Sequence, residues 1–183
     1  MAAFFDALSP EHIEFIEKQP LFFVATAPLA AEARINLSPK GMSTFRVLSP
    51  GRVGYLDLTG SGNETSAHLH ENGRMTFMFC SFDRAPNILR VYGTGKVALR
   101  DGEGWDALAE HFEILPGARQ IITCEVESVQ TSCGFAVPFM ELKGERDTLV
   151  RYAENKGEAK IRQYWQDKNT HSIDGIPVPI PGL

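Results

Sequence analysis

Short apolar runs separated by turn-forming residues recur along the chain, and they constrain the fold more than any other feature of the sequence. Some runs alternate with a period of two and others are apolar on both faces, and both patterns favour strands. Most connections are short, and helices do not alternate with strands as a parallel sheet would require. The sequence therefore predicts an antiparallel β-barrel of six or seven strands with helices at its edges. The candidate strands are residues 21–27, 34–38, 44–48, 52–58, 74–82, 88–99 and 120–129. A turn is expected at 39–41, and Gly93 and Gly95 predict a bulge or a sharp bend within 88–99.

Helical segments are predicted mainly at the two ends of the chain. Ser9 is a suitable N-cap for a helix over 10–19, with Pro10 at its first position. The apolar spacing on either side of Gly157 predicts two C-terminal helices, and the tail after Ile173, with three prolines and two glycines, is expected to be extended. Two shorter helices are predicted at residues 63–72 and 105–112.

Length and charge limit the domain organisation and the partners. A chain of 183 residues, 43% of them hydrophobic, can build one sizeable core, so residues 1–183 are expected to form one domain. The barrel should span about 20–140, and the C-terminal helices and tail about 141–183. A net charge of -5 with a pI near 5.5 gives no broad basic field, which argues against nucleic acid and anionic membranes as partners.

Cysteine usage and the absence of targeting patterns indicate a location. No apolar run is long enough to span a bilayer, and no signal-peptide pattern is seen. The three cysteines are Cys80, Cys124 and Cys133, an odd number without CxxC spacing. They suit reduced thiols better than a disulfide framework. We therefore expect a soluble, cytoplasmic protein whose thiols pack in the core.

The most informative stretch for function is residues 54–69, where a strand-like run passes through a glycine turn into a helix-like run. Two glycines one residue apart allow the backbone to turn tightly and to approach a ligand. The first amide N–H groups of the following helix have no partner within it, so an anion such as a phosphate can bind here. The alternative is a strand followed by a helix capped by Asn63 and ended by Gly73, without a ligand. The turn, residues 59–65, contains Thr59, Gly60, Ser61, Gly62, Asn63 and Thr65.

Three separated stretches, residues 35–41, 54–65 and 88–97, resemble the pyridoxamine 5'-phosphate oxidase-like family of FMN-binding split-barrel proteins. They read INLSPKG, GYLDLTGSGNET and ILRVYGTGKV, and with the strands between them they cover roughly residues 20 to 100. Two later stretches, residues 132–138 and 168–177, resemble the tail of one branch of that family.

The resemblance implies a six-stranded, Greek-key split barrel that forms a homodimer, with one FMN in each of two clefts between the subunits. It also implies that residues 34–38 run beside the isoalloxazine ring, with Lys40 at the end of that strand. The glycine turn would hold the ribityl phosphate, in agreement with the anion site predicted from the turn itself. By position, the cofactor-binding residues are Arg34, Asn36, Leu37, Ser38, Lys40, Thr59, Gly60, Ser61, Gly62, Asn63, Thr65 and Arg90.

Three cationic side chains carry alternative interpretations. Arg90 interrupts an otherwise apolar strand, where a guanidinium needs a phosphate or a carboxylate, and Asp57 is the alternative partner to a ligand. A positive group near the N1–C2=O edge would stabilise the reduced flavin, and Lys40 or Arg34 can serve. The alternative is that both are solvated charges at a turn.

The chain departs from the oxidase itself. The resemblance places an Arg- and Lys-rich phosphate turn and a basic C-terminal region in that enzyme, whereas this turn is rich in Gly, Ser and Thr and this tail in Ile and Pro. We therefore do not transfer pyridoxamine phosphate oxidation. The leading hypothesis is an FMN-dependent oxidoreductase that acts on a small-molecule substrate or takes electrons from a reduced nicotinamide. The alternatives are a non-catalytic flavin carrier or sensor and a haem-binding or haem-degrading relative.

Other chemistry-bearing side chains are expected to be structural. A flavin carries its own redox chemistry, so no protein nucleophile is required. His68 and His70 suggest a metal or haem site, but residues two apart on a helix point roughly 200° from each other. Cys133 precedes Gly134 in a loop that can face a ligand, although a small buried thiol is expected. Trp165 is expected in a core or dimer contact rather than at the flavin.

Overall fold

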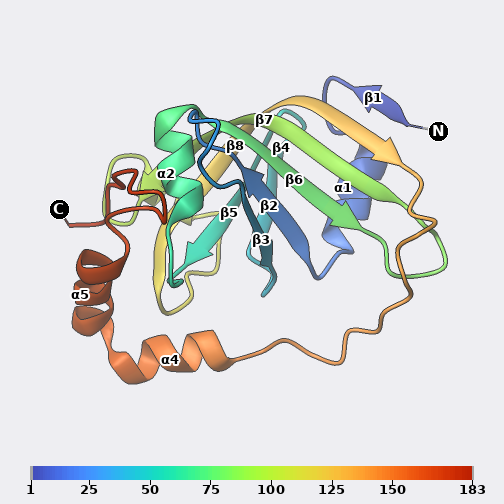
Figure 1. Cartoon of the computed structure of the whole chain (residues 1–183). Coiled ribbons are helices and arrows are strands. Elements are labelled where there is room, and N and C mark those ends of the chain that lie inside the picture. The colour runs from blue at the N-terminus through green and yellow to red at the C-terminus, as the bar shows by residue number, and fades with distance from the viewer. Residues whose placement is uncertain (1, 183) are drawn as a thin grey trace.

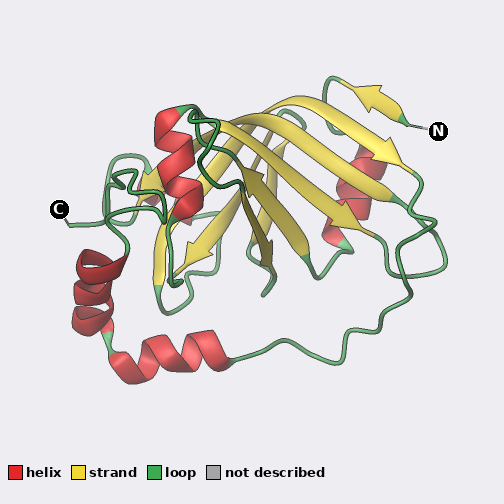
Figure 2. Cartoon of the chain, viewed as in Figure 1, coloured by secondary structure: helices red, strands yellow, loops and turns green. Residues whose placement is uncertain are grey.

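The computed structural model describes residues 2–182, which form one antiparallel sheet with helices around it (Figures 1 and 2). Seven strands follow the order β3-β2-β6-β7-β8-β5-β4, and β1 pairs with β8. The eight strands are β1 (Ala3–Phe5), β2 (Phe22–Thr26), β3 (Asn36–Lys40), β4 (Phe45–Ser49), β5 (Arg52–Leu58), β6 (Arg74–Cys80), β7 (Ile88–Leu99) and β8 (Ala118–Ser132). The helices are α1 (Pro10–Glu17), α2 (Glu64–Glu71), α3 (Trp105–Ala109), α4 (Thr148–Lys156) and α5 (Glu158–Lys168).

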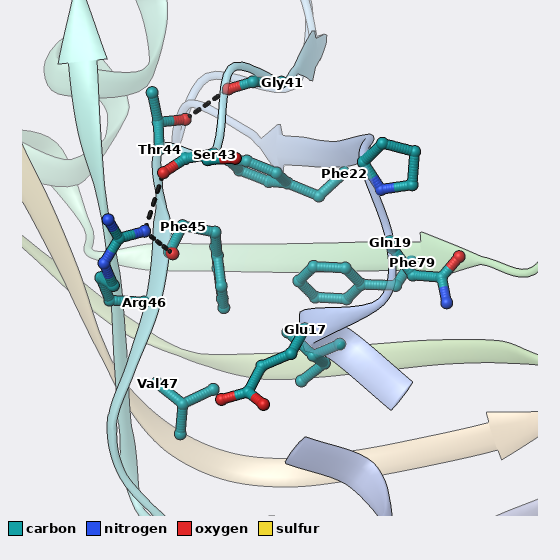
Figure 3. Close-up of a pocket in the computed structure, with 12 residues that line it drawn as sticks. Glu17, Gln19, Phe22, Gly41, Ser43, Thr44, Phe45, Arg46, Val47 and Phe79 are labelled. Carbon is teal, nitrogen blue, oxygen red and sulfur yellow. Dashed lines mark hydrogen bonds between the residues drawn. The ribbon is translucent and has the colours of Figure 1, made fainter. Parts of the chain in front are cut away.

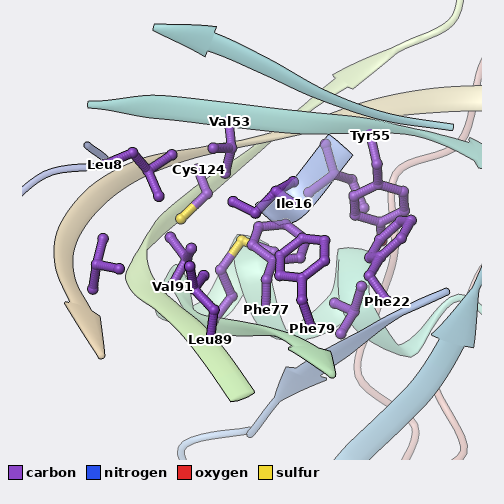
Figure 4. Packing of buried hydrophobic residues seen from close by; sticks show 14 of the residues in the cluster. Leu8, Ile16, Phe22, Val53, Tyr55, Phe77, Phe79, Leu89, Val91 and Cys124 are labelled. Atoms are coloured by element: carbon purple, nitrogen blue, oxygen red, sulfur yellow. The ribbon is translucent and has the colours of Figure 1, made fainter. Parts of the chain in front are cut away.

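The sheet curls around an apolar core to which β2, β5, β6, β7 and β8 all contribute (Figures 1 and 4). Along β2, alternate residues are buried, although the apolar run in its sequence is nearly continuous. Aromatic rings form the centre of the core, with the Phe22 and Phe45 centroids 5.0 Å apart and those of Phe45 and Phe77 5.1 Å apart in edge-on geometry. Helix α1 contributes the buried Ile16 to this core.

Two predicted local features are confirmed. The register of β7 against β8 shifts between Tyr92 and Gly93, where the glycines predicted a bulge. Helix α2 follows Asn63, and Gly73 after it has a φ of 73°. The Asn63 side chain makes no capping hydrogen bond, so its predicted role as N-cap holds for the backbone position alone.

Several predicted boundaries are wrong. A turn was expected at residues 39–41, but Pro39 and Lys40 belong to β3. This is possible because β3 is an edge strand, where the missing N–H of Pro39 breaks no ladder on its outer side. Helix α3 ends at Ala109 rather than near Phe112. Strand β1 was not predicted, because three residues are too few to show a periodic pattern. With β1 the sheet has eight strands instead of the expected six or seven.

The C-terminal part wraps back toward the sheet. A long irregular segment, residues 133–147, leads from β8 to α4, and Figure 1 shows it passing around the sheet before α4 and α5 turn back. Trp165 and Ile161 of α5 form a small buried cluster with Ala153 and Ile180. The tail is not simply extended, because it turns where the Ser172 N–H donates to the Ile176 carbonyl at 2.9 Å.

Candidate functional site

A cavity of about 600 Å³ opens beside the glycine turn, and we refer to it as the polar cavity. Strand β3, the end of β5, the start of α2, the start of β8 and the segment after α5 all line it. The cavity brings together seven of the residues predicted from the sequence: Asn36, Ser38, Lys40, Gly60, Ser61, Gly62 and Thr65.

A buried charge cluster lies at one wall of the polar cavity. The Asp57 carboxylate accepts from Arg119 Nε at 2.8 Å, from Gln120 Nε2 at 2.8 Å and from Lys40 Nζ at 3.3 Å. Arg119 also donates from Nη1 to Asn169 Oδ1 at 2.8 Å. Two cations therefore share one carboxylate, which leaves the cluster with one positive charge at the edge of the cavity.

The surroundings of Asp57 fix its charge. Burial raises the pKa of its carboxyl, but the charges of Arg119 and Lys40 and the hydrogen bonds from Arg119 and Gln120 outweigh burial and place the pKa below its usual value. The carboxylate is ionised at neutral pH and is fully occupied by protein donors. It holds the two cations in place rather than acting as a free base.

A line of polar side chains ties β3 to α2. Asn36 Nδ2 donates to Thr65 Oγ1 at 3.0 Å and to Thr26 Oγ1 at 3.2 Å, and Thr26 Oγ1 contacts His68 Nδ1 at 2.9 Å. His68 is fully buried, and burial lowers its pKa. These bonds set the position of the strand expected beside a flavin relative to the turn expected at its phosphate.

Two residues of the glycine turn are engaged elsewhere. Thr59 is buried, its hydroxyl donates to the Gly117 carbonyl at 2.7 Å, and it accepts from Trp165 Nε1 at 2.8 Å. Asn63 is also buried, and its Oδ1 accepts from Gln120 Nε2 at 2.9 Å. Both side chains hold the turn through contacts with the rest of the protein. Neither lines the polar cavity, although the sequence had predicted that both bind the cofactor.

Three other predicted site residues also lie outside the cavity lining. Of the two alternatives for Arg90, the ion pair with Asp57 is not formed, and Arg90 donates to Ser132 Oγ at 3.2 Å. Arg90 pairs with Gln130 and Asp57 with Gln120, ten residues apart along β8, or roughly 33 Å. Whether Arg90 reaches a cofactor bound to a second copy stays a prediction.

Arg34 precedes β3 and is paired with the C-terminal tail. Its backbone N–H donates to Asp174 Oδ2 at 2.8 Å, and its guanidinium forms an ion pair with the same carboxylate. The Arg34 side chain is nevertheless 67% exposed, so it is a solvent-exposed charge paired with the tail rather than a group free to face a ring edge in this chain. The Leu37 side chain is 64% exposed on the outer edge of β3.

Sequence reasoning missed one cation and one segment of the site. Arg119 stands directly before the apolar run of β8, and the strand was predicted to begin one residue later. The sequence signal that could have identified Arg119 was a charged residue next to an apolar strand. The segment after α5 had been noted only as a family tail, yet it lines the polar cavity through Lys168, His171, Ser172 and Ile173.

A separate cavity of about 290 Å³ lies between α1 and the loop that joins β3 to β4 (Figure 3). Phe22, Phe45 and Phe79 form an aromatic wall, and the Arg46 guanidinium donates to the Ser43 and Phe45 carbonyls, each at 2.7 Å. None of the predicted cofactor residues lines it.

The histidine and cysteine side chains do not form a metal site within the described residues. His68 is buried and His70 is exposed, so the prediction that they point apart is confirmed. Cys133 was expected to be buried but is exposed, because the chain leaves the sheet just after Ser132. Within residues 2–182, no three acidic, His or Cys side chains group as a metal site requires. Across the same range, no helix has both the length and the apolar character needed to cross a bilayer.

Comparison with known proteins assigns the family. Residues 8–133 match the family model described as pyridoxamine 5'-phosphate oxidase. The chain belongs to this family. It is 40% identical over 196 aligned positions to the pyridoxamine 5'-phosphate oxidase family protein ustO of Aspergillus flavus, an alignment that covers 97% of this chain and 78% of that protein.

Solved structures share the fold. A putative pyridoxamine 5'-phosphate oxidase from Lactobacillus delbrueckii has a TM-score of 0.53 at 17% identity, over 68% of this chain and 94% of that one. The FAD binding protein from Mycobacterium smegmatis has a TM-score of 0.50 at 17% identity, over 69% of this chain and 96% of that one. The fold is thus the mainly antiparallel split barrel that the sequence predicted, with eight strands instead of six.

Proposed function

We propose that this protein is an FMN-binding flavoprotein and acts as an FMN-dependent oxidoreductase on a small molecule. The observation that carries the proposal is the polar cavity, where a glycine turn, the start of α2 and a cluster with one uncompensated positive charge meet. Such a set of donors suits a phosphate dianion. Membership of the family and the flavin named for the Mycobacterium smegmatis neighbour support the same cofactor class.

The residues at the cavity fit a flavin with a single phosphate. The backbone of Gly60–Gly62 and the Ser61 hydroxyl would hold the phosphate, and Lys40 would provide its positive charge near the polar edge of the ring. The other carboxylate of the cavity, Glu64, accepts the Ile173 N–H through both oxygens, at 3.0 and 3.1 Å. This hydrogen bond ties the start of α2 to the tail.

When bound, FMN supplies hydride and electron transfer, so the chain needs to bind, orient and bias it. Lys40 can bias the flavin because its position is fixed. Its ammonium donates to Asp57 and lies 5.8 Å from the centre of the Tyr55 ring. Asn36 fixes β3 against α2 and thereby keeps the ring-side strand at a constant distance from the turn.

We also propose a cytoplasmic homodimer in which a second copy covers β3. This strand is an edge of the sheet, and it follows Ile35, which is 75% exposed, and carries the exposed Leu37 beside the polar cavity. Apolar side chains on an open strand edge favour burial against another chain. Three free cysteines are compatible with a reducing compartment.

The decisive experiment is to release any ligand from the purified protein, identify it by mass, and titrate apo-protein with FMN by flavin fluorescence. Ser61→Ala should weaken FMN binding about fivefold and Lys40→Gln about tenfold, as expected for a neutral and a charged hydrogen bond. Ser49→Ala and Lys96→Gln are matched controls, because both residues are exposed outside the cavity. Protein that neither carries nor takes up FMN would overturn the proposal, and bound FMN that no nicotinamide reduces would make the protein a carrier or sensor.

A further inference from the structure

A groove of about 660 Å³ lies next to the polar cavity, and Lys40 lines both. We call it the apolar groove. One wall consists of Pro20, Leu21 and residues 39–42, and the other of residues 142–152 from the segment before α4 and from α4 itself. The two spaces are therefore neighbours, with Lys40 in the wall of both.

The lining of the groove differs from that of the polar cavity. Leu21, Met42, Leu142, Leu149 and Tyr152 supply apolar walls. Leu142 is 63% exposed and Tyr152 is 41% exposed, so both present apolar surface at the groove. Apart from Lys40, the charged residues at the groove are Glu145 and Arg146, of opposite sign and both exposed. A phosphorylated substrate would find no buried cation there.

The loop at the end of the groove is held in an unfavourable conformation. Met42 and Ser43 have φ values of 61° and 50°, in the left-handed region that residues with a Cβ avoid. The Thr44 hydroxyl donates to the Gly41 carbonyl at 2.8 Å, and Arg46 donates to the Ser43 carbonyl at 2.7 Å. These bonds fix the loop so that Met42 lines the groove, and strain maintained in this way is typical of binding sites.

We propose that the apolar groove is the substrate site and that it takes an uncharged, planar and mainly apolar small molecule, such as a quinone or an aromatic compound. The inference rests on the proposed flavin function, because the wall residue Lys40 that the two spaces share is what places this ligand next to the cofactor. The volume suits a small molecule, and pockets for such ligands are mostly apolar with few polar groups. A second copy of the chain is a less suitable occupant, since residues of one chain already supply both walls of the groove.

Menadione is a suitable probe because it is planar and uncharged. Its binding to FMN-loaded and to apo-protein can be measured by isothermal titration calorimetry, with FMN affinity measured separately in every variant. Leu142→Glu and Tyr152→Ala should each weaken menadione binding at least about fivefold while FMN affinity stays within about twofold. Phe135→Glu is the matched control, because it places the same charge on the same segment outside the groove.

The outcomes separate the two proposals. Unchanged menadione affinity in both groove variants would overturn the inference, as would displacement of menadione by pyridoxal 5'-phosphate, which would indicate a charged substrate. A shift from dimer to monomer in the groove variants without loss of menadione binding would assign the groove to a second copy and overturn it too. Menadione binding that depends on Leu142 and Tyr152 in a chain that takes up no FMN would refute the flavin function and leave the groove as the ligand site.

Discussion

The indole N–H of Trp165 donates to the hydroxyl oxygen of Thr59 at 2.8 Å and so joins the C-terminal helix to the first residue of the glycine turn. A second contact joins the same helix to the turn. Asn169, at the end of the same helix, donates to the Gly60 carbonyl at 3.3 Å and accepts from Arg119 at 2.8 Å. The shape of the turn therefore depends on residues more than a hundred positions later in the chain.

Thr59→Val should lower the free energy of unfolding by about 1–3 kcal/mol, because it leaves the buried indole N–H without an acceptor. Thr59→Ser keeps the hydroxyl and should lose much less. Urea denaturation of the two variants measures the difference. Equal stability of the Val and Ser variants would show that the hydrogen bond to Trp165 does not hold the helix in place.

Asp57 should make stability depend on acid pH. Because its pKa is lower in the folded chain than in the unfolded chain, its contribution is complete above the unfolded value of about 4 and is lost as the pH falls through the folded value. Asp57→Asn should remove this part of the pH dependence, which lies below about pH 4. At neutral pH it should cost about 3–5 kcal/mol, because Arg119 is left buried without its counter-ion.

Chemical denaturation of wild-type and Asp57→Asn protein across this pH range tests both statements. Asp174→Asn is a useful comparison, since it removes the carboxylate that meets the more exposed Arg34. A variant that keeps the full acid-induced loss of stability would mean that other carboxylates are responsible.

Local patterns predicted the sheet well, because the alternation of apolar and polar residues indicates which face of a strand is buried. The glycine turn and the bulge at Gly93 were predicted for the same reason, since their backbone requirements are visible in adjacent residues. The site was predicted less completely. Arg119 is buried through partners 62 and 50 residues away, and Arg34 meets a carboxylate 140 residues away. No local sequence pattern indicates such long-range pairs, so neither the role of Arg119 in the site nor the pairing of Arg34 with the tail was predicted.

Gly93→Ala should destabilise the protein by about 1–3 kcal/mol, the cost typical of overpacking. A Cβ at this position would lie 2.0 Å from the Glu125 carbonyl oxygen and 2.7 Å from Cys124 Sγ, and the first of these is backbone that cannot easily move. Gly51→Ala is the control, because nothing lies within 4 Å of its Cβ. Thermal unfolding of both variants checks the prediction, which fails if the two melt together.

Thiol labelling should distinguish the three cysteines of the native protein. Cys133 is exposed, whereas burial raises the pKa of the Cys80 thiol and, with the nearby Glu127 and Glu125, that of the Cys124 thiol to about 12. Since the thiolate is the reactive form, native protein should take up one equivalent of iodoacetamide, at Cys133, and denatured protein three. Mass spectrometry of intact and digested protein measures this, with Cys133→Ser as the control that should remain unlabelled until it is unfolded. Rapid labelling of Cys124 in the folded state would contradict the packing of β8 against β5 and β7, because that packing is what buries its sulfur.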